Sequence, residues 1–96
     1  IYPKEIENVI DDIDDVEESA VIGIQHPDFG ESPVAVIVPR SGRNLNEDQM
    51  MDHISGQLAK FKHPRRLIFV NALPRNTMGK VQKNILRDQY KHCLDG

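Results

Sequence analysis

The sequence lacks tryptophan and has few other aromatic residues, with three Phe and two Tyr among 96 residues. It contains a single cysteine, Cys93, which has no partner for a disulfide within the chain and argues against a disulfide-stabilised secreted fold. Its longest apolar runs, at residues 20–24 and 34–38, are far shorter than the roughly 18 residues that a membrane-spanning helix requires. We therefore expect no membrane span and a reducing, cytoplasmic location.

No targeting segment is visible, because the first residues include neither an initiator Met nor a basic region followed by an apolar stretch. The chain therefore reads as a piece of a longer protein. A composition of 39% hydrophobic and 28% charged residues is typical of one globular domain. A domain of this size has little apolar surface to spare for a deep pocket of its own. We expect any substrate site to be shared with another domain.

Charge is distributed unevenly along the sequence. Residues 1–54 hold 13 acidic and 3 basic side chains, net −10, whereas residues 55–96 hold 2 acidic and 9 basic ones, net +7. One interpretation is that the second half meets an anion such as a nucleotide, a coenzyme phosphate or a nucleic acid. The other is that the two halves neutralise each other inside the fold. Charge alone leaves both interpretations open.

Apolar spacing predicts a helix over residues 3–14. A strand over residues 16–24 follows, because β-branched and small apolar residues replace the helical pattern. Pro33 cannot donate to a sheet ladder, so the second strand is expected to begin after it and to cover residues 34–38. Two neighbouring strands joined by a short loop favour an antiparallel pair.

In the second half, Asn46 can cap a helix that is expected over about residues 47–60. Residues 67–70 form a compact apolar run suited to a buried third strand, and residues 74–79 form a polar loop. A third helix is expected over residues 81–90. The predicted fold class is α+β, a small three-stranded sheet packed with about three helices.

The segment with the clearest chemical signal is the polar loop that ends in Gly79 and Lys80. Gly79 permits close approach of the backbone, and the ammonium of Lys80 can follow an anionic group on its long stem as the loop moves. Spacing alone equally allows a solvated loop lysine. A phosphate-binding P-loop is disfavoured, because no Gly stands five residues before Gly79 and Val81 occupies the Ser/Thr position.

Metal chemistry is not expected. The four histidines are dispersed and no paired cysteines accompany them. The early acidic cluster lacks the spacing and the central Gly of a calcium loop, and we interpret it as a solvated helix end; it comprises Asp11, Asp12, Asp14 and Asp15.

Four motifs stand in order along the chain. Residues 2–7 read Y-P-K-E-I-E, residues 26–31 H-P-D-F-G-E, residues 58–64 L-A-K-F-K-H-P and residues 73–80 L-P-R-N-T-M-G-K. Together they resemble the adenylate-forming enzymes, which comprise acyl-CoA synthetases, luciferases and peptide-synthetase adenylation domains. The initial Tyr-Pro pair resembles acyl-CoA synthetases more than peptide-synthetase domains. The stretch from residue 76 to residue 84 looks most like malonyl-CoA synthetases, although many relatives have Ser in place of Met78.

The resemblance implies that residues 1–96 are the C-terminal lid domain, which rotates on a hinge above a large N-terminal adenylation domain absent from this chain. Lys80 matches the adenylation lysine, whose ammonium would bridge the substrate carboxylate and the phosphate–ribose oxygen while pyrophosphate leaves. The domain would then rotate, withdrawing Lys80 and exposing another face to the CoA thiol. Gly79 and Lys80 would thus lie at the nucleotide. Tyr2 would border the CoA tunnel or simply pack at the hinge.

The implied reaction converts a carboxylic acid, ATP and CoA to acyl-CoA, AMP and pyrophosphate with Mg²⁺, and malonate is the leading substrate. The chain alone is expected to be inactive, because the main pockets lie in the N-terminal domain. Relatives regulated by acetylation suggest a lysine acetyltransferase and a deacylase as partners acting on Lys80. Basic side chains of the second half could contact CoA phosphates or the other domain, or form a plain basic surface: Lys60, Lys62, Arg65 and Arg66.

Two alternatives belong to other functional classes. A stand-alone module could bind nucleic acid or another polyanion through the basic second half. RNA-binding sheets usually present aromatic residues for stacking, whereas the aromatic residues here are scattered along the sequence, which disfavours a nucleic-acid partner. A purely structural interaction domain would not need the intact Gly79-Lys80 pair.

Overall fold

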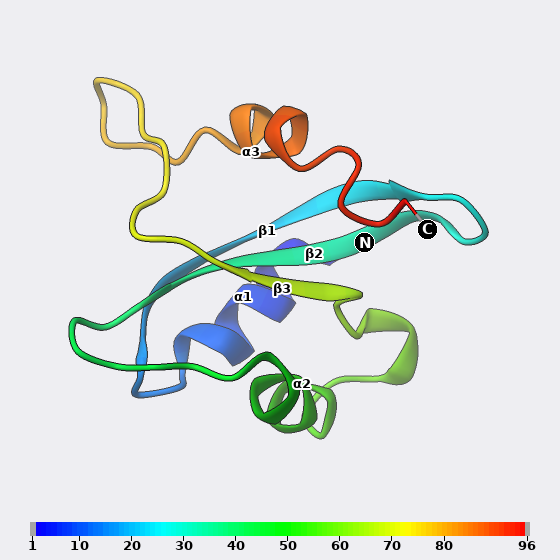
Figure 1. Cartoon of the computed structure of the whole chain (residues 1–96), viewed down its shortest axis with the longest axis horizontal. Coiled ribbons are helices and arrows are strands. Elements are labelled where there is room, and N and C mark those ends of the chain that lie inside the picture. The colour runs from blue at the N-terminus through cyan, green and yellow to red at the C-terminus, as the bar shows by residue number, and fades with distance from the viewer. Residues whose placement is uncertain (1, 96) are drawn as a thin grey trace.

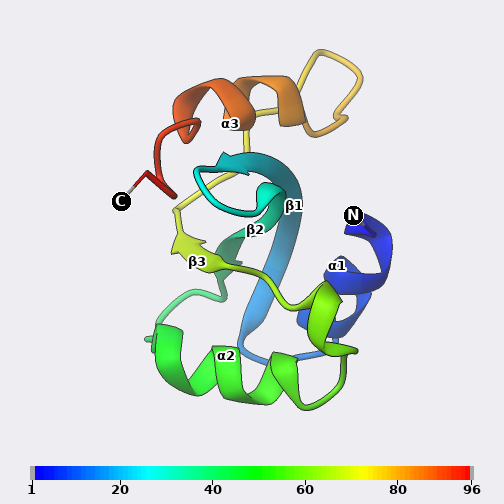
Figure 2. The same ribbon diagram turned by 90° about the vertical axis from the view of Figure 1, so that its right-hand side faces the viewer.

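The computed structural model describes residues 2–95 as a three-stranded sheet with helices on both faces (Figure 1). Strands β1 (Val16–His26) and β2 (Gly30–Pro39) pair antiparallel, and β3 (Arg66–Phe69) pairs parallel to β2, so the strand order is β1-β2-β3. Helices α1 (Pro3–Asp11) and α2 (Glu47–Ser55) cover one face, and α3 (Lys83–Gln89) covers the other (Figures 1 and 2). The predicted α+β class and the antiparallel pair are confirmed.

The central strand β2 is buried on both faces, which explains its continuous apolar sequence. Ala35 and Ile37 pack with α1 and α2, whereas Val34 and Val36 pack with α3 and the segment that follows it. Successive side chains of a strand point to opposite faces, so an unbroken apolar run supplies both cores at once. The sheet is therefore the shared wall of two hydrophobic cores.

On each outer strand, a glutamate from a neighbouring helix accepts a hydrogen bond from a backbone N–H. Glu7 of α1 accepts a hydrogen bond from the backbone N–H of Val21 in β1 at 2.8 Å. Glu47 of α2 accepts one from the backbone N–H of Leu67 in β3 at 3.0 Å. Open sheet edges with unpaired N–H groups are prone to pair with other chains. These two carboxylates satisfy one such group on each edge and fix the helices to the sheet.

The second strand begins at Gly30, so the prediction that it starts after Pro33 was wrong. Pro33 accepts a hydrogen bond from the backbone N–H of Arg65 at 2.8 Å, so its carbonyl faces the β3 side. The N and C=O of one strand residue point to the same side, so the missing N–H also faces that side. Pairing with β3 starts only at Val34, and Pro33 therefore deprives β1 of no hydrogen bond.

Two helices are shorter than the sequence pattern predicted. The first ends at Asp11 rather than residue 14, where consecutive aspartates oppose the negative end of the helix dipole. The second ends at Ser55 rather than residue 60 because Gly56 follows, and only a 3₁₀ turn at Lys60–Lys62 resumes helical geometry. The predicted cap of the second helix is confirmed, since the Asn46 side chain accepts from the backbone N–H of Gln49 at 3.0 Å.

The remaining segments agree closely with expectation. The third strand lies one residue earlier than predicted, and the third helix is slightly shorter. Cys93, in the segment after α3, is partly buried against the core on the α3 face, and this burial raises the pKa of its thiol. Within residues 2–95, none of the helices has both the length and the apolar character to traverse a lipid bilayer.

Candidate functional site

The segment around Lys80 is a closed hairpin rather than an irregular loop. Arg75 and Val81 form a bridge, and the backbone N–H of Asn76 donates to the carbonyl of Lys80 at 3.0 Å. The N–H of Gly79 returns to the carbonyl of Asn76 at 2.9 Å. Gly79 has a φ of +80°, in the left-handed region where a residue with a Cβ would be strained. The glycine therefore serves the turn itself, in addition to leaving room for close approach.

The Asn76 side chain closes the same turn from inside. Its Oδ1 accepts from the backbone N–H of Met78 at 2.9 Å and from that of Lys80 at 3.0 Å. Asn side chains favour turns because they satisfy backbone donors locally. Lys80 thus has its own amide and carbonyl engaged, while its side chain is exposed and forms no ion pair within residues 2–95. The hydrogen bonds fix the backbone of Lys80, and its side chain remains exposed to solvent.

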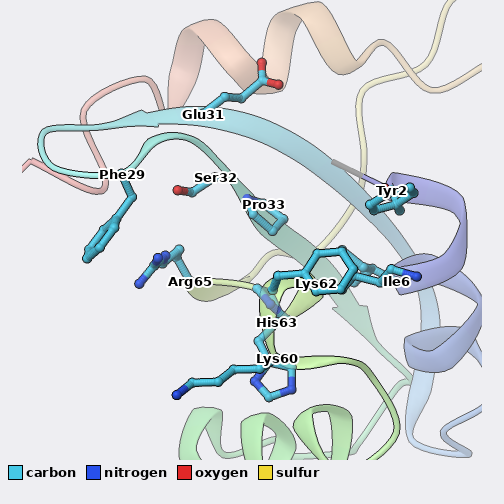
Figure 3. A pocket seen from close by; sticks show the side chains of 12 residues that line it. Tyr2, Ile6, Phe29, Glu31, Ser32, Pro33, Lys60, Lys62, His63 and Arg65 are labelled. Carbon is cyan, nitrogen blue, oxygen red and sulfur yellow. The ribbon is translucent and has the colours of Figure 1, made fainter.

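A second feature is an open cleft of about 770 Å³ between the N-terminus of α1, the β1–β2 turn and the segment before β3 (Figure 3). Three of the five aromatic residues line it: Tyr2, Phe29 and Phe61. They are exposed by 53%, 61% and 72% respectively, which is unusual for large aromatic side chains. The aromatic residues are dispersed along the sequence, but the fold gathers three of them at one cleft. Their dispersion along the sequence is therefore no argument against a surface on which bases stack.

One end of the cleft is formed by Phe29 and Arg65, as Figure 3 shows. The guanidinium carbon of Arg65 lies 4.0 Å from the centroid of the Phe29 ring. His26 lies on the Phe29 side, with ring centroids 4.7 Å apart, and its Nδ1 accepts from the backbone N–H of Asp28 at 3.0 Å. The turn is thereby shaped to hold Phe29 out into solvent beside a cation.

Tyr2 and Lys62 lie toward the other end of the cleft (Figure 3). Lys62 Nζ is 4.6 Å from the centroid of the Tyr2 ring and pairs with Glu5 at 2.7 Å. The Phe61 ring meets Tyr2 edge to face at 6.1 Å. Tyr2 therefore both packs on the 3₁₀ turn and borders the cleft. This geometry leaves both interpretations given for Tyr2 open.

The structure does not bring all predicted site residues together. Gly79 and Lys80 share the hairpin, but neither lines the cleft where Tyr2 lies. In Figure 1 the hairpin projects beside α3 at one end of the molecule, and the segments that form the cleft lie toward the other end. The chain therefore carries two separate candidate surfaces, one with a single presented lysine and one with aromatic and basic side chains.

The structure supports internal neutralisation of the charge asymmetry in part, and the anion-binding interpretation stays a prediction. Three ion pairs join acids of the first half to bases of the second: Glu5–Lys62 at 2.7 Å, Glu7–Lys83 at 2.7 Å and Glu18–Arg75. Within residues 2–95, other basic side chains of the second half pair with no carboxylate, and these include Lys60, Arg65, Arg66 and Lys80. Internal neutralisation thus leaves unpaired cations on both candidate surfaces. In the same described range, no group of His, Cys, Asp or Glu is placed to hold a metal ion.

Residues 5–80 match the family model of the AMP-binding enzyme C-terminal domain. The chain belongs to this family. It is 40% identical over 90 residues to the long-chain-fatty-acid–CoA ligase FadD13 of Mycobacterium tuberculosis, covering 94% of this chain and 18% of the relative. It is 40% identical over 87 residues to the indoleacetate–CoA ligase of Aromatoleum aromaticum, covering 91% of this chain and 17% of that protein.

Solved structures agree with the family assignment. The crystal structure of ATP-bound MatB from Rhodopseudomonas palustris superposes with a TM-score of 0.95 at 55% identity, covering 99% of this chain and 19% of that chain. The chain thus spans less than a fifth of the length of each of these relatives. This C-terminal domain has the α+β fold of the matching part of MatB.

Sequence reasoning missed Phe29 and Arg75. Phe29 stands in a turn motif with no signal of its own, and only the fold places it against Arg65. Arg75 belongs to the motif that ends in Lys80, and its side chain donates to the carbonyl oxygen of Gly79 and to Glu18. The motif could have indicated this role, because an arginine just before a glycine-containing turn can donate a hydrogen bond to a carbonyl oxygen of that turn.

Proposed function

We propose that this domain is the mobile C-terminal lid of an AMP-forming acyl-CoA ligase and that Lys80 supports the adenylation step. Family membership supports the enzyme class, and the named relatives are CoA ligases. The observation that carries the role of Lys80 is its presentation: a hairpin with satisfied backbone groups holds out an ammonium that makes no ion pair within residues 2–95. The partner is the N-terminal adenylation domain of the same protein, in the cytoplasm.

In this proposal Lys80 acts by charge. When the carboxylate oxygen attacks the α-phosphorus of ATP, the bond to the pyrophosphate oxygen breaks and negative charge accumulates on the transferring phosphoryl oxygens. An ammonium placed there lowers the energy of the transition state and aligns the carboxylate, and no proton needs to move. Gly79 permits the hairpin backbone to approach the nucleotide closely.

The cleft fits the second substrate, CoA. Phe29 and Phe61 offer exposed rings for stacking against an adenine, and Lys60 and Arg65 make no ion pairs within residues 2–95 that would compete with phosphates. Tyr2 borders the same cleft, in keeping with a place at the CoA path. Rotation of the lid between two half-reactions would use the hairpin first and the cleft second, which is consistent with their separation on the domain.

We propose malonate as the acyl substrate. The hairpin sequence resembles that of malonyl-CoA synthetases, and this resemblance supports malonate. Selection of the acid itself would fall to the N-terminal domain. Any Mg²⁺ would accompany ATP there.

A polyanion or nucleic-acid module is the second candidate, and the aromatic and basic cleft is the observation that favours it. The same chemistry suits a nucleotide coenzyme, and the family match favours the coenzyme. The two ligands can be compared by measuring how well CoA and an oligonucleotide each displace the other from the protein. Tighter binding of CoA favours the coenzyme, and tighter binding of the oligonucleotide favours the nucleic-acid module.

The test is Lys80→Ala in the intact protein, with the two half-reactions measured separately. Adenylation is followed by pyrophosphate exchange into ATP with malonate, and thioester formation by a single turnover of preformed malonyl-adenylate with CoA. We expect adenylation to fall about 10²–10³-fold, as when one placed electrostatic donor is lost. Thioester formation should change little.

The matched control is Lys91→Ala, which removes an exposed lysine from the segment after α3. It should leave both half-reactions at wild-type rates. Equal loss in both half-reactions for Lys80→Ala, or no loss in either, would refute the proposed role.

A further inference from the structure

The side chain of Arg75 connects the Lys80 hairpin to the sheet. Its Nη1 donates to the carbonyl oxygen of Gly79 at 2.6 Å, and its Nη2 donates to Oε1 of Glu18 on β1. The planar guanidinium is the only protein cation that can serve two acceptors in one rigid fork. One group thus bonds the residue immediately before Lys80 and an acid on a strand far away in sequence.

The fold places Glu18 for this contact by means of a β-bulge. The pairing register of β1 with β2 shifts between Val16 and Glu18. Val16 faces the core under α1, whereas Ala20 and Ile22 face α3. Without the bulge, alternation would put Val16 on the α3 face with Glu18. The extra residue lets Val16 remain buried while Glu18 points to the face where the hairpin stands.

The ion pair is also less solvated than the Arg43–Asp15 pair, which lies at the same end of β1, just before the strand begins. The side chains of Arg75 and Glu18 are 44% and 29% exposed, compared with 60% and 40% for Arg43 and Asp15. Arg43 bonds Asp15 at 2.8 Å and contacts neither the hairpin nor the cleft. Both pairs join an arginine to a carboxylate, but only Arg75 also bonds the Lys80 hairpin.

We propose that Arg75 is a positioning residue for Lys80, with Glu18 as its anchor on the sheet. The proposal rests on the proposed function of Lys80. A hairpin supported only by its own hydrogen bonds could tilt as a unit relative to the sheet. The Arg75 fork fixes its orientation, so rotation of the domain delivers the Lys80 ammonium to a defined point. A displacement of about 1 Å of a catalytic group can cost about 10²-fold in rate.

The test compares Arg75→Ala with Arg43→Ala in the intact protein. Because the fork acts through Lys80 in the transition state, we expect adenylation kcat to fall about 10–100-fold in Arg75→Ala, with the KM for ATP changed less than about threefold. Arg43→Ala should retain wild-type rates. Glu18→Gln keeps the bond from Arg75 to Gly79 and should give a smaller loss, which provides a variant with an intact turn should Arg75→Ala fold poorly.

Two further readouts separate positioning from general stability. Hydrogen exchange of the peptide spanning residues 74–82 should accelerate in Arg75→Ala and stay unchanged in Arg43→Ala. In a Lys80→Ala background, Arg75→Ala should cost no further adenylation rate, since the fork acts only through that lysine.

The outcomes are distinct. If Lys80→Ala abolishes adenylation but Arg75→Ala behaves like Arg43→Ala, positioning by Arg75 is overturned and the role of Lys80 stands. Additive losses in the double variant would likewise overturn it, because Arg75 would then act independently. If Lys80→Ala has no effect, the proposed function fails and the positioning role fails with it.

Discussion

The Lys80 hairpin and the aromatic cleft are both exposed, and both carry cations, but they are built in opposite ways. In the hairpin, backbone groups and the side chains of Arg75 and Asn76 bond one another, and a single ammonium projects. In the cleft, exposed rings lie beside cations, as Phe29 lies beside Arg65, and the space that these side chains line is open.

The difference fits two kinds of anion recognition. Charge that appears only during a reaction is stabilised best by one cation at a fixed point, because a mobile group would lose its alignment. A stable ligand with a flat base and several phosphates is recognised by rings and by several cations that adapt to it. Under the proposed function, the hairpin would serve the transition state of adenylation, and the cleft would serve the coenzyme.

Acetylation of Lys80 is expected to give the largest change on the hairpin side. It removes the positive charge and lengthens the side chain, so it eliminates attraction to carboxylate and phosphate and obstructs the engaged position. Adenylation should fall by at least the roughly 10²–10³-fold expected for loss of one placed donor. The measurement is pyrophosphate exchange by intact protein acetylated stoichiometrically at Lys80, as checked by peptide mass mapping, before and after treatment with a deacylase. Unchanged adenylation would contradict the role of the lysine.

Removing a ring from the cleft should affect the other half-reaction. Phe29→Ala deletes an exposed stacking surface, and stacking of a base on an aromatic residue contributes about 1–3 kcal/mol. The KM for CoA should therefore rise about tenfold, while pyrophosphate exchange is unchanged. Steady-state thioester kinetics in varied CoA give the answer. The control is Phe29→Tyr, which keeps a ring and should behave as wild type. Equal KM values for CoA in all three proteins would contradict a role of the cleft in CoA binding.

The smallest effect, and the sharpest comparison, comes from two glycines with nearly the same backbone. Gly79 and Gly42 have φ values of +80° and +79°, and a Cβ added to either would meet no atom within 4 Å. Alanine at each position should cost about 1–2 kcal/mol of folding free energy through backbone strain alone. Thermal unfolding should therefore shift similarly for the two variants.

Only Gly79→Ala should also slow adenylation, by several-fold, because strain relieved in the hairpin displaces the next residue, Lys80. Gly42→Ala, in the loop after β2, should leave pyrophosphate exchange as in wild type. If both variants slow adenylation equally, the effect belongs to stability and the hairpin has no special precision.

The elements that sequence predicted well are those set by local pattern. The five apolar residues of 34–38 predicted a strand, and they lie within β2, where the structure buries all of them. Gly79 and Lys80 are adjacent in one motif, so the candidate lysine could be named without a fold. Helix ends were less predictable, because Gly56 and the aspartates around residue 12 override apolar spacing that continues past them.

The cleft could not be predicted because distant pairing creates it. Phe29 and Arg65 lie 36 residues apart in sequence. They meet because β3 pairs parallel to β2 with Arg66 opposite Val34, which sets Arg65 beside Pro33 near the β1–β2 turn. Neither that register nor the bulge that orients Glu18 leaves a local pattern in the sequence.

The most direct test of the two-surface account crosses Lys80→Ala with Phe29→Ala in both half-reactions of the intact protein. The account predicts that the lysine variant loses pyrophosphate exchange about 10²–10³-fold with near-normal thioester formation from malonyl-adenylate. It predicts the reverse pattern for the phenylalanine variant at low CoA, and losses that combine without coupling in the double variant. If either single variant impairs both half-reactions to the same extent, the hairpin and the cleft do not serve separate steps and the account is contradicted.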